Sequence, residues 1–135
     1  MPEKITREQR SHTMRQVRSA NTSPEIIVRK LLHGMGFRFR LHDAKLPGKP
    51  DIILKKYGTV IFVHGCFWHR HKNCVRASTP VTNCDYWDRK FRLNVTRDRG
   101  SISSLKKLGL HVLVIWECET RNLSSLEKRL RKNLL

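Results

Sequence analysis

Chemically reactive side chains are concentrated in the segment from Thr59 to Cys74. The segment begins with an apolar run, Thr59–Val63, whose β-branched and aromatic residues are typical of a buried strand. It continues with two cysteines, three histidines and two adjacent large aromatic residues. Thiolates and imidazoles bind metal ions, imidazoles carry protons near neutral pH, and aromatic rings stack on bases. These residue types therefore allow metal binding, acid–base catalysis and contact with nucleic acid.

The spacing of the cysteines indicates a metal site. Cys66 and His71 are separated by four residues, His71 and Cys74 by two, and Cys118 lies far along the chain at the end of the last predicted strand. Short spacings in a loop combined with one distant ligand suit a tetrahedral structural zinc. Zinc would clip down a loop of about 20 residues, which is too long to hold itself in place. Cys84 is an alternative to His71 as the fourth ligand.

Asp51 is the candidate ligand for a catalytic metal. It follows Pro50 at the start of a predicted strand, and a second strand follows closely in the chain. PD-(D/E)XK nucleases hold Mg²⁺ with an Asp in such a place, although Pro-Asp pairs are common in turns. The Glu-x-Lys partner of that motif is missing from the next strand, where Val63 offers its backbone carbonyl instead. A carboxylate, a carbonyl, water and phosphate oxygens make an acceptable Mg²⁺ shell.

His64 and His69 are the candidate proton carriers, because imidazole can activate water for attack on phosphorus. A single histidine is most often a surface residue, but two that flank a metal loop after a metal-binding strand favour catalysis. Glu25 and Asp98 carry carboxylates that can orient a histidine or a metal-bound water. Stabilisation of a helix N-terminus is the alternative role of Glu25.

Three aromatic residues are candidates for stacking on DNA bases. Phe67 and Trp68 are consecutive in a loop, so we expect that they do not both face the same core and that at least one aromatic is exposed. Trp87 begins a predicted helix among basic residues, and this combination suits base stacking beside phosphate contacts. The alternative is that one of the three packs beneath the metal loop.

Hydrophobic periodicity and turn residues predict the elements that position these side chains. Ser23 as N-cap and Pro24 are typical of a helix start. The predicted elements are a helix from Ser23 to about Met35, strands Phe37–Leu41, Pro50–Lys55 and Thr59–Val63, a helix from Tyr86 to Gly109 with Gly100 as a candidate break, a strand Leu110–Trp116, and a C-terminal helix carrying Leu123, Leu126, Leu130 and Leu134. This order predicts an α/β layered domain with a mixed sheet.

Length and charge limit the class of protein. The 135 residues suit one domain, and 28 Lys and Arg against 11 Asp and Glu leave a net charge of +17. Basic residues are spread along the chain, so the default partner of the domain is a polyphosphate, although ribosomal and basic secreted proteins share such a composition. The polar N-terminus and the lack of a membrane-spanning apolar run predict a cytoplasmic, nucleoid-associated protein. In that reducing compartment cysteines favour metal binding over disulfides.

The chain divides into an arm and a domain in this interpretation. Residues 1–22 form a polar, basic N-terminal arm that either contacts DNA or remains a loose tail. Residues 23–135 form the single catalytic domain. One active site per chain favours a monomer.

Together these residues closely resemble the very short patch repair (Vsr) family of DNA mismatch endonucleases. The segment His-Gly-Cys-Phe-Trp-His, residues 64–69, is highly specific to that family. The other matching segments are Met14-Arg15, Asp43–Asp51, Val60–Val63, Asn94–Asp98 and Val114–Cys118.

The resemblance implies a PD-(D/E)XK-like fold similar to type II restriction endonucleases. It implies an enzyme that nicks one strand 5′ of the thymine in T:G mismatches, which arise when 5-methylcytosine deaminates. Asp51 and the Val63 carbonyl would bind two Mg²⁺ ions, and His69 would be the general base with His64 and Glu25 nearby. A cytosine-5 methyltransferase and mismatch-repair recruiting factors would be functional partners.

The resemblance also assigns the remaining site residues. The zinc site maps onto Cys66, His71, Cys74 and Cys118; the intercalating aromatics onto Phe67, Trp68 and Trp87; the mispair contacts onto Lys90 and Asn94; and the minor-groove arm onto Met14, Arg15 and Val17. The chain departs from the family pattern in two places. One extra residue lies between His71 and Cys74, which keeps Cys84 as an alternative ligand, and Val63 replaces a Thr of which only the carbonyl would be used.

Two rival functions remain at this point. A non-catalytic zinc-containing DNA-binding module would keep the charge, the zinc and the aromatics but would not need Asp51, His64 or His69. A restriction-type endonuclease would cut both strands of matched duplex. Aromatic side chains that insert between bases fit the restriction-type endonuclease poorly, because separating stacked bases costs the least free energy at a mispair.

Overall fold

The computed structural model describes residues 22–72, 74, 77–78 and 81–135. The elements in chain order are α2 (Ser23–Gly34), β1 (Arg40–Leu41), β2 (Ile52–Leu54), the 3₁₀ turn η1 (Lys55–Tyr57), β3 (Thr59–His64), α3 (Cys84–Lys107), β4 (His111–Trp116), the 3₁₀ turn η2 (Glu117–Arg121) and α4 (Leu123–Leu134). The strands form one sheet in the order β1-β2-β3-β4. The pairs β1–β2 and β2–β3 are antiparallel and β3–β4 is parallel, so the mixed sheet is confirmed.

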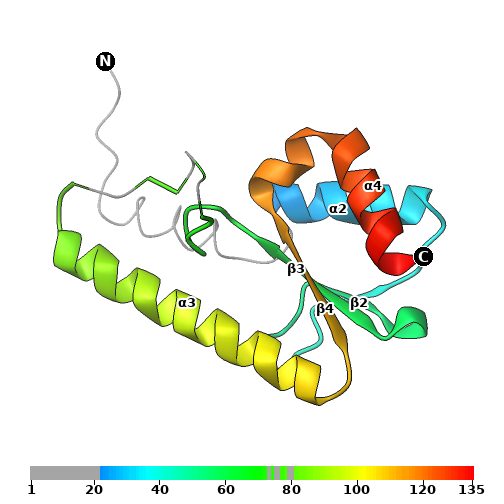
Figure 1. The fold of residues 1–135 in the computed structure, drawn as a ribbon, viewed down its shortest axis with the longest axis horizontal. Coiled ribbons are helices and arrows are strands. Elements are labelled where there is room, and N and C mark those ends of the chain that lie inside the picture. The colour runs from blue at the N-terminus through cyan, green and yellow to red at the C-terminus, as the bar shows by residue number, and fades with distance from the viewer. Residues whose placement is uncertain (1–21, 73, 75–76, 79–80) are drawn as a thin grey trace.

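The helices cover both faces of the sheet. Figure 1 shows α2 and α4 together on one face and the long α3 on the other. The larger core cluster joins α2 and α4 to one face of the sheet through residues such as Leu32, Ile61 and Leu130. Val60 and Phe62 point to the opposite face, where they pack with Leu105 of α3. The alternation along β3 thus divides the core into two layers, because successive strand residues face opposite sides.

The parallel pairing of β3 with β4 decides where the functional residues meet. Its register places His64 opposite Trp116, so both strands end at the same edge of the sheet. Cys66 and Cys118 each lie two residues beyond this pair. Because parallel strands share the edge where they end, residues about 50 positions apart in sequence become neighbours.

Several element boundaries differ from the prediction. Strand pairing before the first hairpin is limited to Arg40–Leu41, because Phe37 is buried against Tyr57 instead, with ring centroids 5.0 Å apart. Helix α3 begins at Cys84 rather than Tyr86 and continues through Gly100 without a break. Cys118 lies on the 3₁₀ turn η2 and not on the strand itself.

The predicted N-cap is also displaced by one residue. Thr22 occupies that position, and its side chain makes no capping hydrogen bond. Among the described residues, no helix is long and apolar enough to cross a membrane.

Candidate active site and metal centre

A cavity of about 1070 Å³ opens at the edge where β3 ends. The start of α2, the end of β3, the loop after it and the middle of α3 form its walls. It is lined by all the predicted catalytic residues, namely Glu25, Asp51, His64, His69 and Asp98. The fold therefore brings together side chains that are up to 73 positions apart in the sequence (25 to 98).

Asp51 stands where β2 and β3 meet. Its backbone N–H donates to the Ile61 carbonyl at 3.1 Å, and its Oδ2 accepts a hydrogen bond from the Val63 N–H at 2.7 Å. Burial raises the pKa of Asp51 to about 7, and the nearby Glu25 carboxyl adds to the rise. A carboxylate in such a place gains from a cation beside it, because burial penalises its uncompensated charge.

Glu25 is the second carboxylate of this wall. Its side chain is 2% exposed, and it is bonded to Arg29 one turn further along α2 and to His42 Nε2 at 2.7 Å. Glu25, His42 and Asp51 each direct a potential ligand atom into a space less than 4.8 Å wide. Carboxylate oxygens are the ligands that Mg²⁺ prefers, so the donor set fits a hard divalent cation.

His42 is a member of this group that the sequence did not indicate. It follows a short strand in a left-handed conformation, with φ of 48°, and nothing in its sequence spacing relates it to Glu25. Its backbone N–H donates to the Asp51 carbonyl at 3.2 Å, so the same residue contacts both carboxylate-bearing segments. Only the folding of α2 against this loop makes the contact.

The two predicted proton carriers are stacked on the other wall. The His64 and His69 rings are nearly parallel, with centroids 3.8 Å apart and an angle of 6° between their planes. His69 Nδ1 lies 2.5 Å from Asp98 Oδ2. A carboxylate at Nδ1 favours the tautomer in which Nε2 is free to exchange a proton.

The environment of His64 keeps its ring neutral. Burial lowers its pKa to about 3, and the neighbouring His69 adds to the effect. The lone pairs of two parallel rings lie in their own planes and do not converge on one point. His64, His69 and Asp98 therefore suit proton transfer better than joint coordination of a metal ion.

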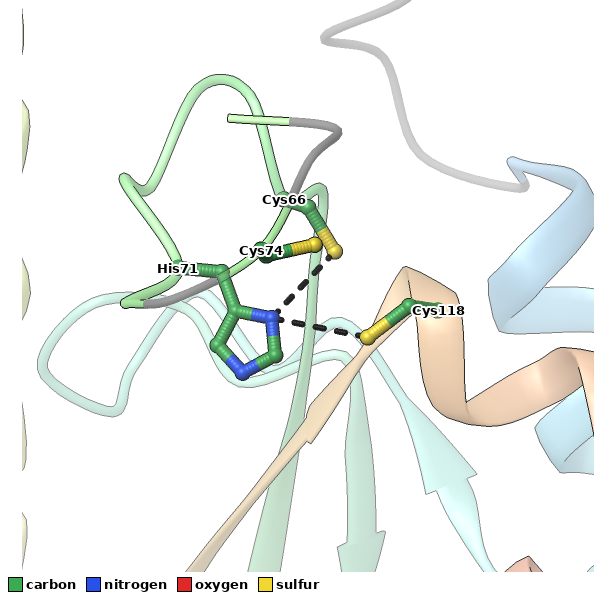
Figure 2. A group of neighbouring side chains, drawn as sticks. All are labelled: Cys66, His71, Cys74 and Cys118. Atoms are coloured by element: carbon green, nitrogen blue, oxygen red, sulfur yellow. Dashed lines mark hydrogen bonds between the residues drawn. The ribbon is translucent and has the colours of Figure 1, made fainter. Parts of the chain in front are cut away.

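A second group of side chains lies beside the cavity, at the ends of β3 and β4. The ligand atoms of Cys66, His71, Cys74 and Cys118 all lie within 4.8 Å of one another. Figure 2 shows the three sulfurs and His71 Nδ1 converging, with Nδ1 at 3.6 Å from Cys66 Sγ and 3.4 Å from Cys118 Sγ. Tetrahedral zinc, with Zn–S bonds of about 2.3 Å and Zn–N bonds of about 2.0 Å, places sulfur and nitrogen about 3.5 Å apart. The donor set and its spacing fit zinc.

The alternative ligand Cys84 lies outside this group. It is exposed in the first turn of α3, and its thiol donates to the Val81 carbonyl at 3.4 Å. Within the group, burial raises the pKa of the Cys66 thiol to about 12, with a contribution from the neighbouring thiols. Zinc would have to displace this proton, since only thiolates are good ligands.

Two contacts brace the metal group. The Trp116 ring stacks on the His71 ring, with centroids 4.2 Å apart and an angle of 11°. Glu119 of η2 accepts the Trp116 N–H at 3.0 Å and is held by Arg129 of α4, whose other nitrogen donates to the Val114 carbonyl at 2.8 Å. The turn that carries Cys118 is thus tied to both β4 and α4.

The three predicted stacking residues form one aromatic cluster with Phe91. Ring centroids lie 5.1 Å apart for Phe67–Trp68, 5.7 Å for Trp68–Trp87 and 5.3 Å for Phe67–Phe91. Phe67, Trp68 and Trp87 are all half-buried. The expectations that one is exposed and that Phe67 and Trp68 face different surroundings are wrong, because the loop turns back and presents both rings to α3.

Neighbouring polar side chains hold this cluster in place. Asn94 is 6% exposed, and its amide donates to the Trp68 carbonyl at 3.3 Å while its oxygen accepts from Arg97 at 2.7 Å. The Arg70 guanidinium lies 4.1 Å from the centre of the Phe91 ring and donates to the Ala77 carbonyl at 2.9 Å. Such a cation–π contact helps to fix a ring in place.

Of the remaining predicted DNA contacts, one lies on α3 and three lie outside the described residues. Lys90 is half-buried on α3, one turn beyond Tyr86. Met14, Arg15 and Val17 lie outside the described residues.

Comparisons with known proteins show which family the chain resembles. A family model described as DNA mismatch endonuclease Vsr matches residues 2–76. The type II nicking enzyme V.XorIIP of Xanthomonas oryzae pv. oryzae is 46% identical over 134 residues, which cover 99% of this chain and 98% of the relative. DNA mismatch endonuclease Vsr of Escherichia coli K12 is 46% identical over 112 residues, which cover 83% of this chain and 71% of the relative.

A solved structure confirms the predicted endonuclease-like fold class. The catalytic domain of homing endonuclease I-Bth0305I superposes with a TM-score of 0.58 at 21% identity, over 83% of this chain and 93% of that domain. The family match covers more than half of the sequence, and the two bacterial relatives cover most of it. The chain belongs to the Vsr family of DNA mismatch endonucleases.

Proposed function

We propose that this chain is a Mg²⁺-dependent endonuclease that nicks one DNA strand 5′ of the thymine in a T:G mismatch. The observation that carries the proposal is a cavity lined by Asp51, by the His69–Asp98 pair, and by Phe67 and Trp68 of the aromatic cluster. It joins a hydrolytic site to surfaces that stack on bases. The family's action on mismatched DNA supports the same substrate.

In this mechanism, Asp51 and the Val63 carbonyl would hold Mg²⁺, with Glu25 nearby on the same wall. Bound Mg²⁺ supplies charge stabilisation at the phosphate that is attacked. His69 accepts a proton from water at Nε2, while Asp98 holds Nδ1 and stabilises the imidazolium that forms. The water oxygen bonds to phosphorus, the phosphodiester P–O bond breaks, and the leaving oxygen takes up a proton. The neutral His64 ring supports His69 from behind by stacking.

A structural zinc at Cys66, His71, Cys74 and Cys118 is the second metal of the proposal. It ties the loop that carries Phe67, Trp68 and His69 to the end of β4. The positions of the catalytic histidine and of the stacking aromatics would therefore both depend on this zinc site. Closed sites with four protein ligands are typical of structural zinc.

Recognition in this proposal depends on local opening of the base stack. A T:G wobble pair stacks poorly, so separating it from its neighbour costs less than in matched DNA. Phe67, Trp68 and Trp87 would take the place of the lost base contacts, and the basic surface would bind the phosphates. Such an enzyme acts on chromosomal DNA, which places it in the bacterial cytoplasm, and one site per chain suits a monomer that makes a single nick.

The deciding experiment compares three duplexes under two metal conditions. T:G, C:G and T:A duplexes of one flanking sequence, with each strand labelled in turn, are incubated with the protein in Mg²⁺ or EDTA. We expect a nick 5′ of the mismatched thymine only, on the T:G duplex in Mg²⁺. Tight T:G binding without cleavage would instead favour a non-catalytic binding module, and cleavage of both strands of matched DNA would favour a restriction-type enzyme.

A further inference from the structure

The loop that leads into Asp51 packs closely against α3 at Gly48. Gly48 has φ of 73°, and a Cβ added there would lie 2.5 Å from Ser101 Cβ and 3.2 Å from the Phe62 ring. No side chain fits in that space without a shift of α3 or of the strand. The loop backbone therefore packs closely against α3 here, and the next residue, Lys49, lines the cavity.

Lys49 adopts an unusual backbone conformation at this wall. Its φ is 49°, in the left-handed region that residues with a Cβ rarely occupy. The Lys49 N–H donates to the Leu46 carbonyl at 3.1 Å, which holds the turn closed. Strained backbone conformations of this kind cluster at active sites and ligand-binding sites. The turn directs the chain so that Lys49 and Asp51 line the same cavity.

Acidic side chains outnumber the Lys and Arg residues around the cavity. Glu25, Asp51, Asp98 and Glu117 contribute four carboxyl groups to the lining, whereas its Lys and Arg residues are Lys49 and Arg97. Arg97 is already hydrogen-bonded to Asn94 at 2.7 Å. Within the part of the chain that the structure describes, the Lys49 ammonium has no ion pair or hydrogen bond of its own. A phosphodiester that enters this acidic cavity needs a cation beside it.

We propose that the Lys49 ammonium binds a non-bridging oxygen of the phosphate that is cleaved. The inference rests on the proposed function and names a residue that contacts its substrate. Lys49 reaches the phosphate from the loop before Asp51, and the His69–Asp98 pair acts from the loop after β3. An ammonium beside these oxygens stabilises the negative charge that increases on them during attack. In this role Lys49 takes the place of the lysine of the Glu-x-Lys motif, which β3 lacks.

The test uses three substitutions in the full chain. K49N removes the charge with a residue that tolerates the left-handed conformation, and K49R keeps the charge. K45N is the matched control, because Lys45 lies in the same loop, is exposed and does not line the cavity. Single-turnover nicking of T:G duplex is measured at saturating protein in Mg²⁺, together with the melting temperature and the salt dependence of duplex binding.

We expect K49N to reduce the saturated nicking rate by about a hundredfold to a thousandfold, the scale found for loss of one donor to a developing charge. K49R should retain most of the rate, K45N should match the wild type, and all three should melt near the wild-type temperature. Equal rates for K49N and K45N would overturn the proposal. So would a K49N variant that only binds both duplexes more weakly while its saturated rate is unchanged. Absence of nicking by the wild type would count against the proposed function itself, which separates the two failures.

Discussion

At the scale of a single residue, both the position and the charge of Asp51 matter for the proposed metal site. The hydrogen bond from the Val63 N–H fixes its carboxyl group where two strands meet. Its raised pKa shows that the folded protein makes the charged form costly when no cation is present. Replacement by asparagine keeps an oxygen for the Val63 N–H and removes the charge.

The D51N variant should therefore lose nicking of the T:G duplex, by a factor of about 100 or more, because the metal loses its carboxylate. Binding of the duplex should be kept, since phosphate and stacking contacts lie elsewhere. The melting temperature should not fall, because a buried charge near Glu25 is removed. Gel-based nicking and fluorescence anisotropy measure the two functions. D43N, which changes an aspartate of the loop before Asp51, is the control, and near-normal cleavage by D51N would exclude Asp51 from the mechanism.

Elements, rather than single residues, bring the four candidate metal ligands together. The ends of β3 and β4 present Cys66 and Cys118, and the loop between β3 and α3 supplies His71 and Cys74. Four coordinate bonds at this place would tie the loop to the end of β4, whereas its Phe67, Trp68 and His69 side chains contact α3. The free energy of zinc binding should therefore contribute directly to folding.

Metal analysis of the purified protein should give about one zinc per chain. C118S should lose zinc and lower the melting temperature strongly, because the loop loses its attachment to η2. C84S is the matched control, since Cys84 is exposed and lies outside the ligand group. Loss of zinc by C84S together with retention of zinc by H71A would show that Cys84 and not His71 is the fourth ligand.

The aromatic cluster also depends on how two elements pack, because its rings come from the loop after β3 and from α3. Trp68 contacts Phe67 and Trp87 and is held from behind by Asn94. The rings are thus assembled before DNA arrives, which reduces the entropy cost of ordering them on the substrate. Some of the ring surface now used within the cluster would have to turn toward the bases.

W68A should weaken binding to T:G duplex by about tenfold to hundredfold, on a scale of roughly 1–3 kcal/mol for each stacked base. Its affinity for matched duplex should hardly change, because that affinity comes from the basic surface. Paired titrations at one salt concentration measure both values. Y57A, which removes a tyrosine packed on Phe37 by η1, is the control. Equal losses on the two duplexes would mean that Trp68 supports the fold and does not read the mismatch.

At the scale of the whole molecule, the net charge of +17 dominates encounter with DNA. Arg92 on α3 is an example of how exposed cations remain available. It pairs with Asp88 at 2.9 Å, but the two side chains are 80% and 61% exposed. Surface pairs of this kind contribute little to stability, so phosphate can compete with the aspartate for Arg92.

R92A should weaken binding to mismatched and matched duplex alike, and should lower the slope of log affinity against log salt by about 0.9 if one phosphate contact is lost. R131A is the matched control, because Arg131 makes the same kind of helical pair with Glu127 at 2.8 Å on α4. Figure 1 shows α4 on the face of the sheet opposite α3. A salt slope unchanged by R92A, or changed equally by R131A, would place the phosphate contacts elsewhere.

The sequence by itself determined the elements and the chemistry that they carry. Strand Thr59–His64 follows from its apolar run, and α4 from leucines at helical spacing. Asp51, His64 and His69 were identified as reactive groups by residue type and by resemblance to a family that the comparisons confirm. Local patterns suffice for this, because the period of a strand or helix depends on neighbours in the chain.

Tertiary structure decided which of these groups meet. The parallel register of His64 with Trp116 places Cys66 beside Cys118, and the packing of α2 against the loop before β2 brings His42 to Glu25. The turn after β3 puts His71 in the metal group in place of Cys84, and the packing of the same loop on α3 presents Phe67 and Trp68 to that helix. Such contacts join residues far apart in sequence, and their geometry depends on how whole elements pack, which no local pattern records.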